Sequence, residues 1–170
     1  MLVDAVGQIP SLCDAPVTCD FYGPIHDEVR DEFLTALQTV PQARYCGVAE
    51  PGTGPHLIAR YDALVLPTYY DTEGHPGALI EAMHAGVPVI STQVRTFPEL
   101  IRNGWNGLLV PTQNSSALAE AILLLAMNPA MRREMGEANR LKGQEFRADA
   151  VVARLLKIVF PESFFPRNSN

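Results

Sequence analysis

Short apolar runs alternate with longer segments of helical periodicity along most of the chain, and this alternation is the feature that most restricts its fold. Glycine and proline mark the joints between the two kinds of segment. Strands are expected at residues 17–23, 43–48, 62–68, 87–92 and 107–112. Strands that alternate with helices at this spacing pair in parallel and carry helices on both faces of the sheet. The sequence therefore predicts an α/β fold with a Rossmann-like doubly wound parallel sheet.

Helices are expected between these strands and after the last of them, where no further strand follows. Asp27 is the expected N-cap of the helix over residues 27–40, and either Ser115 or Ser116 is that of the helix that ends near residue 128. Gly86 is expected to close the helix that begins near Gly77. The opening stretch "MLVDAVGQI" is typical of the second half of a helix with no strand before it. We expect one domain over residues 1–160, which begins within its first helix, and a peripheral tail over 161–170.

Composition narrows the class of protein. The chain has 170 residues, of which 47% are hydrophobic and 19% charged, as in a folded soluble domain. Its net charge of -6 and the lack of a basic stripe argue against nucleic acid as a partner. Three cysteines without zinc-ligand spacing indicate free thiols in a reducing compartment. With no signal peptide or membrane-length apolar run, a cytoplasmic location is expected, while peripheral membrane association stays open.

The loop from Tyr69 to Ala78 leaves the carboxyl end of the third strand and enters a helix, which is where parallel α/β sheets bind ligands. Backbone N–H groups and the helix dipole favour an anion there. Two glycines leave the backbone open to a phosphate, and His75, Gly77 and Ala78 are the expected donors. Such a joint is also how many domains turn a corner, so the pattern alone leaves both interpretations open.

Glu81 lies one helical turn further on, among apolar neighbours. A carboxylate buried there without a partner costs several kcal/mol. Two interpretations stay open on this evidence. Glu81 faces outward or accepts a hydrogen bond from a neighbouring N–H, or it accepts hydrogen bonds from the vicinal hydroxyls of a ribose.

A longer sequence pattern around Glu81 favours the interpretation that Glu81 binds a ribose. Glu73 and Glu81 are eight positions apart and are followed by "AMHAGVPVI", with "PELI", "NGLLV" and "ALAEAI" downstream. This run resembles the carboxyl-terminal, donor-binding domain of group 1 retaining glycosyltransferases, the glycogen synthase-like superfamily of two-domain GT-B enzymes. The resemblance implies transfer of a hexose-type sugar from a nucleotide-sugar donor to a glycan or lipid-linked acceptor, as in polysaccharide biosynthesis.

The resemblance also assigns roles to residues. Glu73 is implied as the catalytic-site glutamate near the donor sugar, Glu81 as the ribose ligand, and Val48 as the backbone contact to the nucleobase. The donor sugar and diphosphate are implied to lie against Glu73, Gly74, His75, Gly77 and Ala78. Neither a metal nor another cofactor is implied, because protein donors hold the diphosphate.

The chain departs from the family at its start. The family places an Arg and a Lys-Gly pair, both contacting the diphosphate, after a first strand that has no counterpart here. We therefore expect about half of a glycosyltransferase, inactive alone, with a gap in the middle of its sheet. The chain is expected to close that gap directly or to borrow a strand through self-association. The alternatives are a non-catalytic structural or interaction module and, less favoured by the "EAMHAG" run, a sugar-nucleotide epimerase of the same fold.

Overall fold

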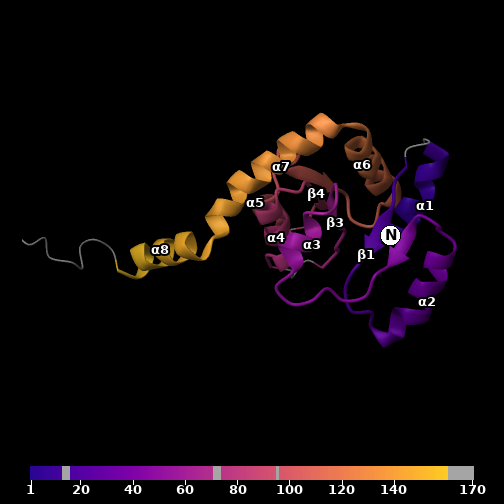
Figure 1. The fold of residues 1–170 in the computed structure, drawn as a ribbon, viewed down its shortest axis with the longest axis horizontal. Coiled ribbons are helices and arrows are strands. Elements are labelled where there is room, and N and C mark those ends of the chain that lie inside the picture. Colours follow the sequence, from indigo (N-terminus) through magenta and orange to yellow (C-terminus); the bar gives the residue numbers. More distant parts are fainter. Residues whose placement is uncertain (13–15, 71–73, 95, 161–170) are drawn as a thin grey trace, which may run out of the picture.

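The computed structural model describes residues 1–12, 16–70, 74–94 and 96–160, which form parallel strands flanked by helices (Figure 1). The strands are β1 (Cys19–Phe21), β2 (Ala43–Tyr45), β3 (Leu64–Leu66), β4 (Val89–Thr92) and β5 (Gly107–Val110). The helices are α1 (Leu2–Leu12), α2 (Asp27–Gln38), α3 (Gly54–Ile58), α4 (Gly77–Ala85), α5 (Phe97–Leu100), α6 (Ser115–Met127), α7 (Pro129–Gly143), η1 (Gln144–Phe146) and α8 (Ala148–Val159). Each strand lies inside a range that the alternation predicts.

The strands form two sheets rather than one. β1 pairs in parallel with β2, and β3, β4 and β5 form a second parallel sheet in that order. Within the described residues β1 and β3 share no ladder, so the expectation that the chain closes the gap directly is wrong. Helix α1 packs on α6, and its Ala5 and Ile9 are buried in one cluster with residues of α6 and β4.

The sheet of β3, β4 and β5 is covered on both faces, as a doubly wound fold requires. One core contains Ile90 and Val110 with apolar residues of α1, α6 and α7. The other contains Val89 with residues of α3, α4 and α5. Alternate residues of a strand face opposite sides, so neighbours on β4 enter different cores. All four β4 residues are buried, whereas the β3 residues are half-buried because β3 is an edge strand of this sheet.

The predicted N-caps of α2 and α6 are both wrong. Asp27 is the first residue of α2, and the N-cap is His26, whose side chain makes no capping hydrogen bond. The N-cap of α6 is Asn114, whose side chain accepts a hydrogen bond from the Ala117 N–H at 2.9 Å. Ser115 and Ser116 are instead hydrogen-bonded to the side chain of Gln8 and so tie α6 to α1. Gly86 closes α4 in the left-handed conformation, as predicted.

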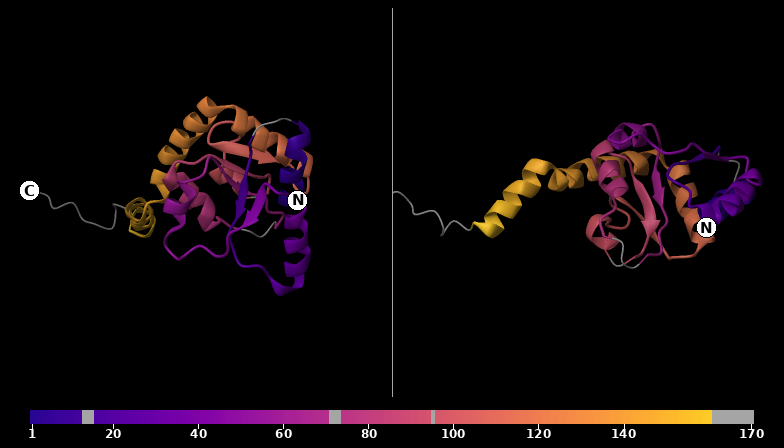
Figure 2. Two further views of the ribbon diagram at one scale, coloured as in Figure 1. Left: turned by 45° about the vertical axis from the view of Figure 1, so that its right-hand side comes forward. Right: turned by 90° about the horizontal axis from the view of Figure 1, so that it is seen from below.

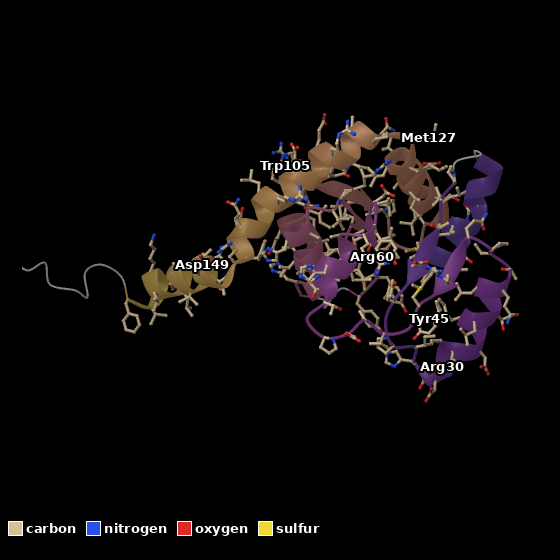
Figure 3. All side chains as sticks on the ribbon, in the orientation of Figure 1. Arg30, Tyr45, Arg60, Trp105, Met127 and Asp149 are labelled. Carbon is tan, nitrogen blue, oxygen red and sulfur yellow. The ribbon has the colours of Figure 1, made fainter. Side chains whose placement is uncertain are left out.

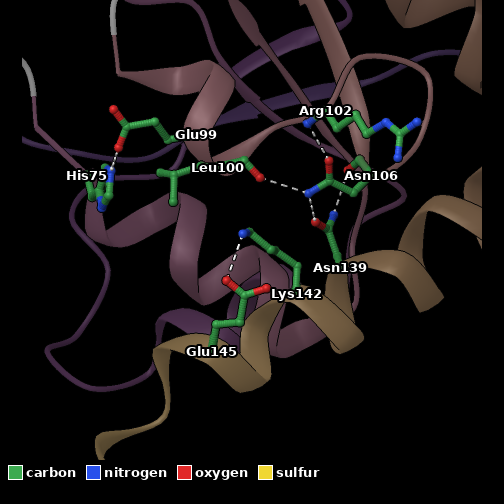
Figure 4. Close-up of polar contacts among 8 residues, drawn as sticks. All are labelled: His75, Glu99, Leu100, Arg102, Asn106, Asn139, Lys142 and Glu145. Atoms are coloured by element: carbon green, nitrogen blue, oxygen red, sulfur yellow. Dashed lines mark hydrogen bonds and ion pairs between the residues drawn. The ribbon is translucent and has the colours of Figure 1, made fainter. Parts of the chain in front are cut away.

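A buried amide pair holds α7 against the second sheet. Asn139 Nδ2 donates to the carbonyls of Val87 and Asn106 at 2.6 and 2.8 Å. The Asn106 side chain donates to Asn139 Oδ1 and to the Leu100 carbonyl, and accepts from the Arg102 N–H (Figure 4). Both side chains are fully buried, and these bonds use all of their polar atoms.

Helix α8 lies beyond the end of α7, away from both sheets (Figures 1 and 2). Its side chains, among them that of Asp149, extend into solvent (Figure 3). The exposed large apolar side chains of this segment are Val151, Val152, Leu155, Leu156, Ile158, Val159 and Phe160. Among the described residues, none of the helices is both long and apolar enough to cross a membrane.

Candidate functional site

The amino-terminal end of α4 carries unpaired backbone donors. Its N-cap, Pro76, has extended dihedral angles and no N–H, and the first backbone bond runs from the Leu79 N–H to the Pro76 carbonyl at 3.0 Å. The N–H groups of Gly77 and Ala78 meet no carbonyl of the described residues. A side-chain carbon added at Gly74 or Gly77 would meet nothing within 4 Å. These two amides are therefore donors without a carbonyl partner among the described residues, at the positive end of a helix, where an anion is favoured.

The segment before α4 is fixed from the side of α5. Thr96 Oγ1 donates to the Gly74 carbonyl at 3.1 Å. His75 Nε2 lies 3.3 Å from Glu99 Oε2 (Figure 4). The His75 ring also packs edge-on against Phe146. The described structure thus gives His75 an anchoring role in this segment. Glu73, the implied catalytic residue, lies outside the described residues.

Glu81 is neither buried nor fully exposed. Its carboxylate lies against Gly54, the first residue of α3. It makes no hydrogen bond or ion pair with any described residue, so within this part of the chain Glu81 does not cap a neighbouring N–H.

Val48 lies on the loop that connects β2 to α3 and is 66% exposed. The loop is held at its start, where the Gly47 carbonyl accepts a hydrogen bond from the Gly23 N–H at 3.0 Å. The backbone N–H and C=O of Val48 pair with no other backbone group of the described residues. Val48 therefore offers one donor and one acceptor, the pair that the edge of a nucleobase requires.

These features lie around one edge of the second sheet and the adjoining β2 loop. Helix α3 packs against α4, and the contact between Gly54 and Glu81 brings the end of the β2–α3 loop next to α4. The structure thus unites Glu81 with the start of α3, four residues along the same helix from the free amide of Gly77. Sequence reasoning missed Gly54, Thr96 and Glu99. A second glycine in "PGTGP" was the available signal for Gly54.

A separate polar cluster joins the two sheets. Asp20 of β1 accepts hydrogen bonds from Arg44 Nη2 at 2.7 Å and from the Tyr61 hydroxyl at 2.8 Å. The hydrogen bond from Arg44 and then that from Tyr61 hold the pKa of Asp20 below its usual value against the effect of burial. Burial, and then the bonds to Tyr22 and Asp20, raise the pKa of Tyr61. Burial followed by the charge of Asp20 also raises the pKa of the Cys19 thiol, to about 12.

Comparison with known structures supports the fold. The Anabaena protein HepE, solved in complex with UDP-glucose, superposes with a TM-score of 0.80 over 93% of this chain and 43% of its own length, at 21% identity. At this identity the likeness shows a shared fold. It agrees with parallel strands and helices on both faces.

Comparison of sequences identifies the family. An exopolysaccharide phosphotransferase of Streptomyces coelicolor is 41% identical over 105 residues, which are 59% of this chain and 11% of that protein. N-acetyl-alpha-D-glucosaminyl L-malate synthase of Bacillus anthracis is 28% identical over 164 residues, 94% of this chain and 41% of that enzyme. The chain thus spans less than half the length of these relatives. The model of the family "Glycosyl transferases group 1" matches residues 2–142, and on this match the chain belongs to the group 1 glycosyltransferases.

Proposed function

We propose that this chain is the donor-binding half of a retaining glycosyltransferase that transfers a hexose-type sugar from a nucleoside diphosphate to a glycan or lipid-linked acceptor. One observation carries the proposal. The amides of Gly77 and Ala78 and the carboxylate of Glu81, none of which has a hydrogen-bond partner among the described residues, lie on the same short helix. A donor of this class needs both kinds of group, because it carries a diphosphate and a ribose diol.

The diphosphate is proposed to sit on the amino-terminal end of α4. As the bond to the sugar breaks, negative charge grows on the departing phosphate oxygen. Amide N–H groups already aimed at that position stabilise the charge without reorganising. Glu81 is four residues from Gly77, a rise of about 6 Å along the helix, so its carboxylate is placed one turn further on to accept the two ribose hydroxyls.

The remaining roles complete the proposal. The free N–H and C=O of Val48 are proposed to bind the nucleobase edge. Glu73 is proposed to act beside the donor sugar, on the resemblance to the family. The amides of α4 are proposed to hold the diphosphate in place of a divalent metal or other cofactor, so donor binding is expected to persist in EDTA.

Donor binding tests the proposal in the protein at its full natural length. UDP-, GDP- and ADP-sugars are compared by thermal shift and calorimetry, because a ligand that binds the native state raises its melting temperature. Glu81→Ala is expected to weaken binding of the preferred donor by about 10-fold or more, since hydrogen bonds to a charged group contribute about 1.5–3 kcal/mol.

Glu120→Ala is the matched control, because Glu120 is an exposed carboxylate of α6. It is expected to leave donor affinity unchanged. A protein that binds none of these donors, or whose Glu81→Ala variant binds them as tightly as the wild type does, contradicts the proposal.

Self-association is proposed as a second property. β1 and β3 each present an unpaired edge within the described residues, and such edges pair readily with other strands. Size-exclusion chromatography with light scattering is expected to show a dimer, and a strict monomer at all concentrations contradicts this. A cytoplasmic location is also proposed, supported by the free thiols of Cys19 and Cys46.

A further inference from the structure

We infer that Gly54 is a positioning residue for nucleotide recognition, because the space left by its missing side chain is what the carboxylate of Glu81 occupies. The inference rests on the proposed function, in which Glu81 binds the ribose. It adds a residue from another helix, 27 positions earlier in the chain, and a physical reason why a glycine stands there.

The geometry around Gly54 is unusually close. A Cβ atom built on Gly54 would lie within 2.6 Å of the carboxylate carbon and both carboxylate oxygens of Glu81, whereas real Cβ atoms essentially never approach another atom closer than 3.0 Å. No other side chain or backbone atom is among its three nearest neighbours. Any larger residue at this position must therefore push the Glu81 carboxylate away.

Backbone conformation does not explain this glycine. Gly47 and Gly52 of the same loop have φ values of 83° and 80°, which disfavour residues with a side chain. Gly54 is not among the glycines with positive φ. Added Cβ atoms at Gly47 and Gly52 would meet nothing within 4 Å. The loop thus uses Gly47 and Gly52 to turn the chain and Gly54 to leave room.

Packing is what orients Glu81. On either side of it along α4, Leu79, Ala82 and Met83 are fully buried, which fixes the helix face from which its side chain starts. No hydrogen bond or ion pair with a described residue holds the carboxylate. Contact with a bare Cα restricts the side chain and leaves the oxygen lone pairs free, because Cα–H groups are weak donors at most. Two vicinal hydroxyls can then each donate to one oxygen.

The inference predicts a selective defect. In Gly54→Ala the displaced carboxylate should lose the diol, while the α4 amides should still hold the diphosphate. The test compares ribo and 2′-deoxy ligands by calorimetry in the full-length protein, using the pairs UDP and dUDP, GDP and dGDP, and ADP and dADP. The wild type is expected to prefer the ribo form of its base by about 10-fold, the value of one hydrogen bond to a charged group.

Gly54→Ala is expected to reduce that preference to less than about 2-fold, with the affinity for the deoxy ligand nearly unchanged. Adding Glu81→Asp, which shortens the side chain by one methylene, is expected to restore part of the preference. Discrimination in Gly54→Ala equal to that of the wild type overturns the inference while the proposed function stands. A wild type that does not distinguish ribo from deoxy ligands, or binds neither, removes the proposed function and this inference with it.

The melting temperature without ligand is the control for folding. Gly54→Ala is expected to melt close to the wild type, because the atoms that must move are the end of the flexible Glu81 side chain. A variant that melts far below the wild type, and equally far below it in the Glu81→Ala background, contradicts the inference, because the added methyl group then strains something other than the carboxylate.

Discussion

The carboxylate of Asp20 connects three segments of the chain. It takes hydrogen bonds from β2 through Arg44 and from the segment after α3 through Tyr61. The Asp20 side chain is 13% exposed and that of Arg44 is 73% exposed, so the ion pair is screened and contributes at most about 1 kcal/mol. The bond from Tyr61 is partly buried and adds to this.

A pH-dependent stability follows from Asp20. Its pKa is lower in the folded than in the unfolded chain, so its stabilising effect is present above the unfolded pKa of about 3.9 and is lost as the pH falls through the folded pKa. Asp20→Asn is expected to lower the free energy of unfolding by about 1 kcal/mol at pH 7. By urea denaturation, the difference from the wild type should shrink as the pH is lowered below about 4.

Asp31→Asn is the control for Asp20→Asn, since it removes the same charge from an exposed side chain of α2 that makes no hydrogen bond or ion pair with a described residue. It should change stability little at either pH. A loss in Asp20→Asn that stays the same from pH 7 to pH 3 contradicts the role assigned to the ionised carboxylate.

The positions of candidate site residues along the chain could be predicted from the sequence, but the residues that they contact could not. The spacing of Glu81 from Gly77 was enough to place both residues on one helix, about one turn apart. The contact of Glu81 with Gly54 was not predictable, because a steric contact between residues 27 positions apart leaves no periodic pattern. Only the packing of α3 against α4 creates it.

At the scale of elements, α7 depends on a polar contact inside an apolar interface. Removing the Asn139 side chain takes a hydrogen bond from the carbonyls of Val87 and Asn106, and it leaves the Asn106 amide nitrogen with only its bond to Leu100. One unsatisfied buried group costs about 1–3 kcal/mol. Asn139→Ala is therefore expected to lower the free energy of unfolding by at least about 2 kcal/mol, measured by urea denaturation.

Glu134→Ala on the exposed face of α7 provides the comparison, because it truncates a side chain of the same helix that faces solvent. Its effect should stay within about 0.5 kcal/mol. If the two variants are equally stable, the buried amide pair does not hold α7 in place.

The helices and strands were predicted from their periodicity, and Gly86 was predicted as the end of α4, but the N-caps of α2 and α6 were not. Five strands and their parallel pairing follow from the alternation, because burial on both faces requires continuous apolar runs. Ser115 and Ser116 are good cap residues in isolation, yet Asn114 caps α6 while both serines bind Gln8 of α1. The position of the N-cap therefore depends on contacts with α1, more than 100 residues earlier, and a local sequence pattern cannot predict such contacts.

At the scale of the whole molecule, two sheets are joined by side chains and helix packing. The joining contacts are the Asp20 cluster, the bonds from Gln8 to α6, and the apolar packing of α1 on α6. The sequence could not predict that β1 and β3 do not pair, because strand periodicity indicates which faces are buried but not which strand lies at each edge. In the fold, the partial exposure of β3 marks the edge of its sheet.

The division into two sheets also affects how the protein unfolds locally. Hydrogen bonds along a continuous sheet break together, whereas the pair β1–β2 can separate with α2, which packs on β2, while β3, β4 and β5 stay closed. Native-state amide hydrogen exchange is expected to show this as a cooperative unit of lower opening free energy in residues 19–21 and 43–45 than in residues 89–92. One shared opening free energy for both sets would mean that the molecule, despite its divided sheet, unfolds as a single body.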